Sequence, residues 1–486
     1  MRRLESIILS SLGVVMASNT SVTIKRLNKD ASIESPIKEI EAISSKSFMH
    51  RALICASLAQ GRSTISYRGL SQDIMATLSA LEVMGAKIYI EEDWMTVEAI
   101  PVDNRAHKIN RQGDFDHSRF DGDYREKIVD CRESGSTLRM LLPVATRLSD
   151  DYVFVGKKEL MARPIYDLTR ALRQAGFSIS SDSLPIEIRN IIGRKRDIEP
   201  KKISDFQIRG DISSQYISGL LLAGPLMDGK LRVDVMDKLE SKPYIDLTKD
   251  VMSLFGVEVE EYDSRESLAD GDRNRIIKTY SIKPGQTYKS NKIKAESDWS
   301  NAGFFLAIGA LFRGIRVLNL DLESSQGDKR IIEILKEYGA RLVVKDSYIE
   351  VLPGQRKPLN LNIADTPDML PILAILAVFA EGESSFTGID RLRIKESDRI
   401  ESVISMVECL GACACLKGKN LIISGRDRKK LPVYRVNSFN DHRIVMASSI
   451  AASLLDGQLI IEGAEAVNKS YPTFFDDFKV LGFEVR

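Results

Sequence analysis

The sequence predicts a mixed α/β (α+β) protein of two pseudo-symmetric domains, each built from three repeated βαβαββ-type units with buried helices wrapped by sheets. Three observations predict this architecture: a length of 486 residues, six recurring helix–glycine–strand segments, and six strongly apolar helical segments. A chain of this length exceeds one ordinary core. Recurrence at a regular spacing indicates one structural unit that is used several times.

The first series of segments combines an amphipathic helix, a glycine and an alternating strand. The apolar spacing before each glycine has the helical period, as in "GDKRIIEILKEYG", and the alternation after it is typical of a strand. A glycine at this junction fits the position that follows a helix C-terminus. The six segments are "LEVMGAKIYI", "LRQAGFSISS", "MSLFGVEVEE", "LKEYGARLVV", "VECLGACACL" and "KVLGFEV", with Gly85, Gly176, Gly256, Gly339, Gly411 and Gly482.

The second series consists of helices that are apolar on most faces and are therefore expected to be buried. One occurs in each repeat, so the repeats predict six buried helices, three in each domain. They are "SKSFMHRALICASLAQG", "SGSTLRMLLPVATRLS", "SSQYISGLLLAGPLMDG", "WSNAGFFLAIGALFRG", "DTPDMLPILAILAVFAEG" and "NDHRIVMASSIAASLLDG".

Polar residues gather at the starts of these apolar helices. The stretch "RESGSTLRM" is typical either of an ordinary capped helix or of an anion site at a helix N-terminus. Caps alone do not require cations, which ordinarily disfavour helix N-termini. The helix-start residues are Lys46, Ser47, Arg51, Ser134 to Thr137, Arg139, Ser213, Ser214, Gln215, Asp368, Asp441, His442 and Arg443. We therefore expect them to face a shared cleft that accepts a substrate with several negative charges.

Composition argues against several classes of protein. The net charge of +1 gives no global field for nucleic acid or an anionic membrane. Five cysteines, an odd number, predict reduced thiols and a cytoplasmic location. The alternation in "ACACL" favours a strand over a metal clip at Cys413 and Cys415, and none of the four histidines forms an i, i+4 pair. We expect no metal site and no membrane span.

The N-terminus resembles a weak signal peptide, with Arg2 and Arg3 before an apolar stretch. Glu5 interrupts that pattern. We interpret these residues as an extension, with Met16 as a possible alternative start.

The chain resembles the 5-enolpyruvylshikimate-3-phosphate synthase (3-phosphoshikimate 1-carboxyvinyltransferase) family from about residue 44 to its end. The resemblance rests on nine motifs in the family's order. They are "SKSFMHRA", "SGSTLR", "ARPIYDL", "GDISSQ", "SKPYIDLT", "DTPDMLP", "RIKESDRIES", "NDHRIVMA" and "VNKSYPTF".

The family fold has two domains joined by two crossings. The resemblance implies one domain over 45–295 and another that combines 1–44 with 296–486, with the active-site cleft between them. Three charged segments, around 103–130, 183–204 and 261–290, are expected to be surface loops or insertions.

The reaction implied by the resemblance transfers the enolpyruvyl group of phosphoenolpyruvate to the 5-hydroxyl of shikimate 3-phosphate and releases phosphate. It would proceed by addition and elimination through a tetrahedral intermediate, which needs only protons and fixed charges. We therefore expect no cofactor and, as partners, only the two small-molecule substrates, with no nucleic acid and no membrane. The chain is expected to be a monomer and, by resemblance, a glyphosate target.

The site residues are carried over from the family's motifs to the matching positions of this chain. Guanidinium groups suit the bidentate recognition of carboxylate and phosphate. Shikimate 3-phosphate would be held by Lys46, Ser47, Arg51, Ser213, Ser214, Gln215, Ser241, Tyr244, Asp368 and Lys395. Phosphoenolpyruvate would be held by Lys46, Gly135, Arg163, Gln215, Arg399, Arg443 and Lys469. Asp368 would be the base at the 5-hydroxyl, and Glu396 with Lys46 would handle the methylene proton.

Each of these residues also has an ordinary structural interpretation. Asp368, between two prolines, could favour a helix start. Glu396 and Arg399, three residues apart, could form a surface pair on one helix.

The chain departs from the family pattern at several positions. Ile43 and Ser44 stand where the family often has Pro and Gly. Glu133 replaces a customary Asn and adds negative charge, and Arg391 stands where an Asn often contacts shikimate 3-phosphate. His442 could be structural or could take part in the chemistry.

Two other functions remain as alternatives. The related UDP-N-acetylglucosamine enolpyruvyl transferases carry Lys-Asn where this chain has Lys46-Ser47, and a loop Cys that "KKELMARPI" lacks. A non-catalytic anion-binding protein on the same repeats would gain nothing from the carboxylates of Asp368 and Glu396.

Overall fold

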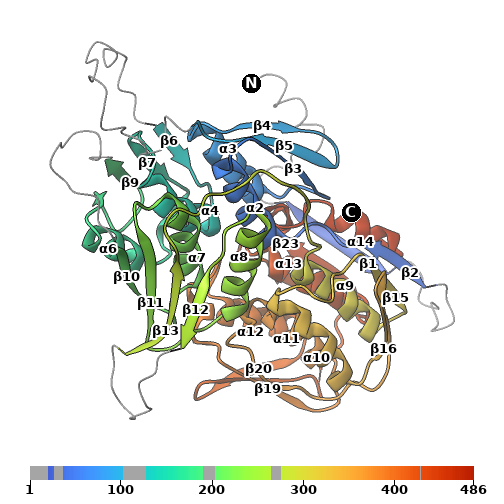
Figure 1. The fold of residues 1–486 in the computed structure, drawn as a ribbon. Helices are drawn as coiled ribbons and strands as arrows, with labels where there is room; N and C mark the ends of the chain where they lie inside the picture. Colours follow the sequence, from blue (N-terminus) through green and yellow to red (C-terminus); the bar gives the residue numbers. More distant parts are fainter. Residues whose placement is uncertain (1–19, 27–36, 102–126, 190–202, 264–274, 427) are drawn as a thin grey trace, which may run out of the picture. The chain divides into compact units, whose positions relative to one another are not determined.

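The computed structural model describes residues 20–26, 37–101, 127–189, 203–263, 275–426 and 428–486 (Figure 1). The N-terminal stretch interpreted as an extension, with Met16, and the middle of each charged segment lie outside these residues. The flanks of those segments differ from expectation, because β9 (Ile186–Arg189) and β13 (Ile276–Ile282) are strands and not loops. In both strands alternate apolar side chains are buried, including Ile186 and Tyr280, and this burial outweighs the local charge.

The chain divides into two compact units. Unit 1 comprises Met1–Ser45, Gly69–Gln72 and Glu296–Arg486, and unit 2 comprises Lys46–Arg68 and Asp73–Ala295. Each unit contains three four-stranded sheets among its described residues.

Unit 2 has the sheets β14-β3-β5-β4, β6-β7-β9-β8 and β10-β11-β13-β12. Their further strands are β3 (Arg62–Ser66), β4 (Lys87–Ile90), β5 (Trp94–Glu98), β6 (Lys127–Asp130), β7 (Tyr152–Val155), β8 (Ser178–Ile179), β10 (Ile203–Arg209), β11 (Lys230–Met236), β12 (Glu260–Asp263) and β14 (Lys292–Lys294). Its helices are α2 (Lys46–Leu58), α3 (Gln72–Val83), α4 (Gly135–Ala145), α5 (Lys158–Met161), α6 (Tyr166–Gln174), α7 (Ser214–Ala223), η3 (Gly224–Leu226) and α8 (Lys242–Leu254).

Unit 1 has the sheets β22-β23-β1-β24, β16-β17-β15-β2 and β18-β19-β21-β20. Their strands are β1 (Ser21–Arg26), β2 (Lys38–Glu41), β15 (Ile315–Leu318), β16 (Arg341–Lys345), β17 (Tyr348–Leu352), β18 (Asn360–Asn362), β19 (Glu383–Thr387), β20 (Cys413–Lys417), β21 (Asn420–Ser424), β22 (Val433–Asn437), β23 (Gln458–Glu462) and β24 (Phe483–Val485). Its helices are α9 (Trp299–Leu311), η4 (Gly327–Arg330), α10 (Ile331–Tyr338), η5 (Pro367–Met369), α11 (Leu370–Val378), η6 (Asp390–Ile394), α12 (Arg399–Cys409), α13 (His442–Ala451), η7 (Ala464–Lys469) and α14 (Phe474–Val480).

All six sheets have the same topology. In each, the two strands at one edge pair in parallel and the remaining neighbours pair antiparallel, as in β6-β7-β9-β8 and β18-β19-β21-β20. In four of the sheets the parallel pair is connected through a buried helix: α4 between β6 and β7, α7 between β10 and β11, α11 between β18 and β19, and α13 between β22 and β23. The repeated unit predicted from the sequence is therefore confirmed.

Two strands pair with a sheet distant from them in sequence. β2 leads into α2 but pairs with β15, and β14 leads into α9 but pairs with β3. The chain therefore passes twice between the units. Beside these two crossings Ser44 bridges Ser297, and the N–H of Asp298 donates to the carbonyl of Ile43 at 2.8 Å.

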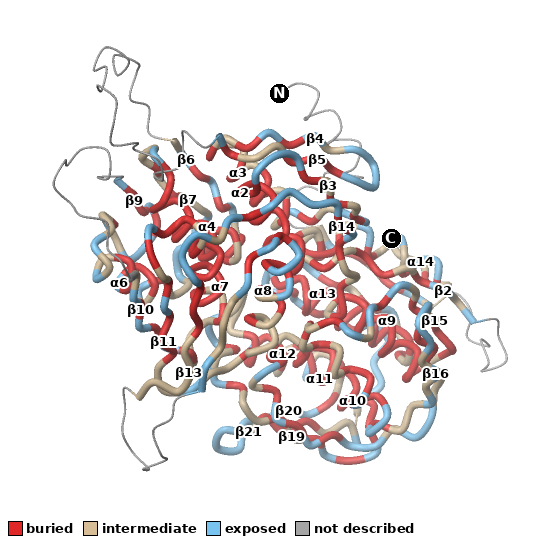
Figure 2. Tube along the Cα trace, in the orientation of Figure 1, coloured by how far each residue is buried: buried red, intermediate tan, exposed pale blue. Residues whose placement is uncertain are grey.

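The predicted buried helices form the centre of each unit. Every residue of α11 and α13 is buried, and in α9 every residue except Ser300. Figure 2 shows these helices, and α2, α4 and α7 of unit 2, in the colour of buried residues. Sheets cover them, so the expectation of helices wrapped by sheets is confirmed.

The six glycines that follow the amphipathic helix of each repeat adopt the conformation expected of them. Their φ angles lie between 78° and 110°, the left-handed region that side chains with a Cβ rarely adopt. The alternation in "ACACL" forms β20, which confirms the predicted strand, and all five cysteines are free thiols.

Gly219 marks a close approach of two buried helices in unit 2. A Cβ there would lie 2.4 Å from the carbonyl oxygen of Arg139 and 3.1 Å from the Cα of Met140 on α4. Gly219→Ala should lower the free energy of unfolding by about 1–3 kcal/mol, despite the better helix propensity of alanine. Gly303→Ala is the matched control, because its Cβ would approach the Cδ1 of Ile372 at 3.1 Å, the movable end of a side chain. Equal urea midpoints for the two variants would contradict this interpretation.

Candidate active site

The predicted site residues form one array in each unit. In unit 2, Lys46 is the first residue of α2, and its Nζ lies 2.8 Å from Oδ2 of Asp73, in the first turn of α3. Sequence reasoning missed Asp73, which belongs to none of the motifs. The only indication of it is an acid in the first turn of the amphipathic helix.

Arg51 is enclosed by unit 2. Its side chain donates to Oγ1 of Thr248 at 2.7 Å, to the carbonyl of Ser47 at 2.6 Å and to the carbonyl of Tyr244 at 2.9 Å. Burial lowers the pKa of Arg51 to about 10, and the side chain is only 1% exposed. Arg51 therefore holds the backbone of two predicted ligand residues, and its own contact with a substrate stays a prediction.

The stretch "RESGSTLRM" begins α4 with an ordinary cap and a polar chain. The hydroxyl of Ser134 accepts from the N–H of Thr137 at 3.2 Å and from its hydroxyl at 2.7 Å. The Thr137 hydroxyl meets that of Thr77 at 2.7 Å, which meets Nδ1 of His50 at the same distance. Burial, with Lys46 and Arg51, lowers the pKa of His50 well below its usual value, which favours the neutral ring.

A second chain of hydrogen bonds beside this cap positions Gln215, a predicted ligand. Arg139 donates to Oε1 of Gln215 at 2.9 Å and to the carbonyl of Pro164 at 2.9 Å. The Nε2 of Gln215 donates to Oγ of Ser136 at 2.8 Å. A Cβ on Gly135 would lie 3.0 Å from Nη1 of Arg163. The absence of a side chain at Gly135 therefore leaves room for the guanidinium of Arg163.

The other predicted residues of unit 2 stand at the starts of α7 and α8. Ser213 caps α7 by accepting from the N–H of Gln215 at 3.3 Å, and Ser214 is its first residue. Ser241 precedes α8 with a φ of 58°, and Tyr244 follows in the first turn. The additional negative charge of Glu133 is paired with Lys157 at 3.0 Å.

Arg399 is the centre of the array in unit 1. Its Nε lies 3.0 Å from Oδ2 of Asp441, its Nη1 2.6 Å from Oδ1 of Asp368, and its Nη2 2.6 Å from Oε2 of Glu396. The guanidinium is 0% exposed, so Glu396 and Arg399 are not a surface pair. They also do not share a helix, because α12 begins at Arg399 and is capped by Asp398.

The carboxylate of Asp368 also contacts two further cations. Its Oδ1 lies 3.1 Å from Nζ of Lys395, and its Oδ2 lies 3.5 Å from Nη2 of Arg443. Burial raises the pKa of Asp368, but Lys395, Arg443 and Arg399 together outweigh burial and hold the pKa well below its usual range. Asp368 is therefore a carboxylate wherever this array is intact.

The array is also held by residues that sequence reasoning named as helix starts or departures, and by Lys469, which it named as a ligand of phosphoenolpyruvate. Oδ1 of Asp441 caps α13 by accepting from the N–H of Arg443 at 2.9 Å. Arg391 donates to the carbonyl of Ala364 at 3.0 Å, in the segment before Asp368. His442 is 2% exposed, with its Nδ1 3.9 Å from Oδ1 of Asp441. The Nζ of Lys469 donates to the carbonyl of Asn440 at 2.7 Å.

Comparison with known proteins decides the family. The sequence model of EPSP synthase (3-phosphoshikimate 1-carboxyvinyltransferase) matches residues 32–478. The 3-phosphoshikimate 1-carboxyvinyltransferase of Clostridium kluyveri is 37% identical over 445 residues, 91% of this chain and 94% of that relative. The chain belongs to the EPSP synthase family.

Solved structures show the same fold. The EPSP synthase of Acinetobacter baumannii superposes with a TM-score of 0.72 at 23% identity, covering 96% of this chain and 99% of that one. The enolpyruvyl transferase NikO of Streptomyces tendae gives a TM-score of 0.67 at 14% identity, covering 97% and 99%. The two-domain enolpyruvyl transferase fold expected from the resemblance is therefore confirmed. The family model and the curated relative, not these structures, disfavour the UDP-N-acetylglucosamine alternative.

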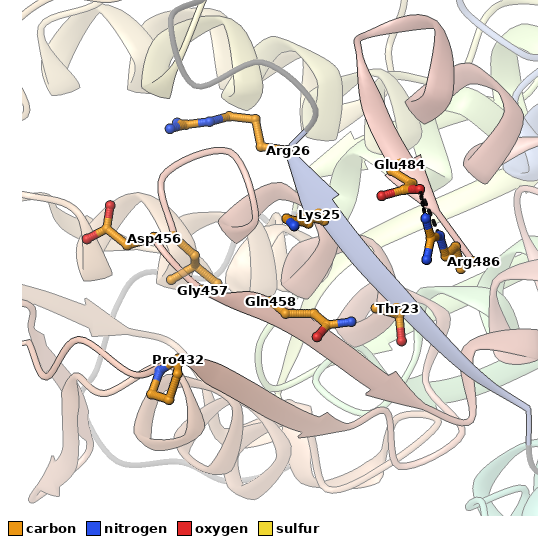
Figure 3. Close-up of a pocket in the computed structure, with 10 residues that line it drawn as sticks. Thr23, Lys25, Arg26, Pro432, Asp456, Gly457, Gln458, Glu484 and Arg486 are labelled. Carbon is orange, nitrogen blue, oxygen red and sulfur yellow. Dashed lines mark hydrogen bonds and ion pairs between the residues drawn. The ribbon is translucent and has the colours of Figure 1, made fainter.

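One cavity of unit 1 is lined by other residues than those of its array. It has a volume of about 570 Å³ and is lined by charged and polar side chains that include Lys25, Arg26, Asp456 and Arg486 (Figure 3). None of the residues carried over from the EPSP synthase family lines it.

The described residues contain neither a membrane-spanning helix nor a cluster of metal-ligand side chains. No helix there is long and apolar enough to cross a membrane, and no three His, Cys, Asp or Glu side chains there are grouped so as to hold a metal ion.

The buried pair of Asp441 and Arg399 gives a stability prediction. Asp441→Asn keeps a capping oxygen for α13 but removes one of the charges around Arg399. We expect a loss of about 2–4 kcal/mol in the free energy of unfolding, since Asp368 and Glu396 remain. Asp398→Asn is the matched control, an N-cap whose partner Arg393 is 46% exposed, and should cost below about 1 kcal/mol. Similar losses for both variants in urea titrations would argue against this role of Asp441.

Proposed function

We propose that this chain transfers the enolpyruvyl group of phosphoenolpyruvate to the 5-hydroxyl of shikimate 3-phosphate and releases phosphate. The observation that carries the proposal is the group of Asp368 and Glu396 around the guanidinium of Arg399 in unit 1. A protein that only binds anions needs no group that accepts or donates a proton beside its cations, whereas the addition and elimination steps need both.

We propose that units 1 and 2 are the two domains of the family and that the substrates lie in the cleft between their arrays. Lys46, Gly135, Arg163 and Gln215 of unit 2 would then act on phosphoenolpyruvate together with Arg399, Arg443 and Lys469 of unit 1. The hydroxyls of Ser47, Ser213, Ser214 and Ser241, with Arg51, Tyr244 and Lys395, would hold shikimate 3-phosphate.

The proposed addition step moves two protons. Asp368 accepts the proton of the 5-hydroxyl as that oxygen attacks C2 of phosphoenolpyruvate, and Glu396 with Lys46 supplies a proton to the methylene carbon. Anionic substrates offset the cations around Asp368, so its pKa rises toward the range in which it can accept a proton. Elimination of phosphate from C2, with loss of a proton from the same methyl carbon, then restores the carbon–carbon double bond and leaves the enol ether of the 5-oxygen.

Protons and fixed charges suffice for these steps, so the proposal includes no cofactor and no metal. We further propose a cytoplasmic monomer that uses only the two small-molecule substrates. The odd number of cysteines and the net charge of +1 support this.

A phosphate-release assay tests the function. Phosphate should appear only when both shikimate 3-phosphate and phosphoenolpyruvate are present, and release should persist after treatment with a chelator. Release with UDP-N-acetylglucosamine in place of shikimate 3-phosphate would support the related transferase, and binding of both substrates without release would support an anion-binding protein.

Asp368→Asn tests the proposed base. The change is nearly isosteric and removes the proton acceptor, so kcat should fall by about 10²–10⁴-fold while both substrates still bind. Asp365→Asn is the matched control, an exposed carboxylate of the same segment, and should leave kcat unchanged. A kcat of Asp368→Asn within a few-fold of wild type would reduce Asp368 to a helix-start residue.

Gly135→Ala tests the proposed phosphoenolpyruvate site. The added methyl would press on Nη1 of Arg163 at 3.0 Å and approach Nη1 of Arg139 at 3.4 Å, both movable ends of side chains. We expect the KM for phosphoenolpyruvate to rise more than the KM for shikimate 3-phosphate, with the melting temperature little changed. Equal rises in both KM values, or a lower melting temperature with unchanged KM values, would contradict this role.

A further inference from the structure

Asp328 is a buried carboxylate of unit 1 that the proposed reaction does not use. It lies on η4, is 3% exposed, and its Oδ2 accepts a hydrogen bond from the hydroxyl of Ser300. Its Oδ1 is buried and, among the described residues, has no hydrogen-bond partner. A buried carboxylate with only half of its acceptors satisfied is costly, so its presence needs an explanation.

Ser300 connects this carboxylate to Arg443. Nη2 of Arg443 donates to Oγ of Ser300 over a long 3.4 Å, and Nη1 donates to the carbonyl of Asp368 at 3.2 Å. A serine hydroxyl has one proton, so donating that proton to Asp328 leaves its lone pairs for Arg443. The guanidinium therefore has Asp368 as one partner and the Ser300–Asp328 pair as another.

The charges around Asp328 oppose one another. Burial raises the pKa of Asp328 to about 6, Arg443 on α13 acts to lower it, and Asp368 on η5 and Asp298 before α9 act to raise it. Asp328 can therefore change its protonation state near neutral pH, whereas Asp368 stays ionised.

We propose that Asp328 is a positioning residue that acts through Ser300 as the counter-ion of Arg443 in the empty site and is displaced from that role by the anion of phosphoenolpyruvate. The inference rests on the proposed function, in which Arg443 holds phosphoenolpyruvate. It explains why a carboxylate is retained near a cation that must bind an anion, because the empty array otherwise carries an excess of buried positive charge.

The direction of the pH effect follows from linkage. A bound anion offsets the charge of Arg443 and so removes an attraction that favours ionised Asp328, which raises the pKa of Asp328. Asp328 then takes up a proton on binding, and its contribution to the affinity for phosphoenolpyruvate falls as pH rises through about 6.

Three variants separate the charge of Asp328 from its hydrogen bond. Asp328→Asn is always neutral and keeps an oxygen for Ser300, so its KM for phosphoenolpyruvate at pH 8 should be about five-fold or more below wild type. Asp328→Ala and Ser300→Ala remove the support of Arg443, so their KM for phosphoenolpyruvate should rise, with the KM for shikimate 3-phosphate little changed. Ser324→Ala is the matched control, a buried hydroxyl of the same segment that donates to Glu296, and should leave both KM values unchanged.

The experiment measures the KM for phosphoenolpyruvate at saturating shikimate 3-phosphate from pH 5.5 to 8 for wild type and these variants. The ratio of wild-type to variant KM cancels the titration of the substrate's own phosphate. We expect that ratio to increase with pH for Asp328→Asn. A ratio that is independent of pH, or equal rises in KM for Asn and Ala at position 328, would overturn the inference. Absence of phosphate release by wild type would instead overturn the proposed function, and this inference with it.

Discussion

The arrangement of unit 1 depends on the buried guanidinium of Arg399. A charge that is 0% exposed is tolerated only where opposite charges and hydrogen bonds compensate it, and here three carboxylates do so. These carboxylates come from η5, from the segment before α12 and from the cap of α13, so one cation brings three segments together. Asp368 and Glu396, the groups proposed to move protons, are thereby placed by the same charge that stabilises the unit.

In unit 2 the site residues are held mainly by hydrogen bonds between neutral groups. Its hydroxyl chain runs from His50 on α2 through Thr77 on α3 to Thr137 and Ser134 at the start of α4, and it joins these three helices without leaving a net charge. Arg51 and Arg139 donate to the protein itself, to backbone carbonyls and to Gln215. The cations of this unit thus divide into those that build the array and those, such as Lys46, that remain partly exposed within it.

Much of the fold follows from local patterns. The period of the apolar residues predicted both series of helices, and the cap residues predicted where several of them begin, as at Ser134 for α4, Ser213 for α7 and Asp441 for α13. The glycines after the amphipathic helices were predicted because these helix ends need a residue in the left-handed conformation, which is a requirement of the backbone alone. The strands at 186–189 and 276–282 were missed, since their burial depends on neighbouring strands that local charge does not reveal.

The sequence alone thus predicted the helix starts, the repeat boundaries and the types of residue in the site, because caps and periodicity depend on residues a few positions apart. Which side chains form hydrogen bonds or ion pairs with each other could not be predicted in this way. Asp73 joins Lys46, Asp328 joins Ser300 and Asp441 joins Arg399 across 27, 28 and 42 residues, and only packing brings each pair within reach. Packing also decides which arginines are buried, because nothing in the residue type distinguishes Arg51 and Arg399 from an exposed arginine. Only the tertiary structure removes these guanidinium groups from water, and a buried charge is then stable only if its partners compensate it.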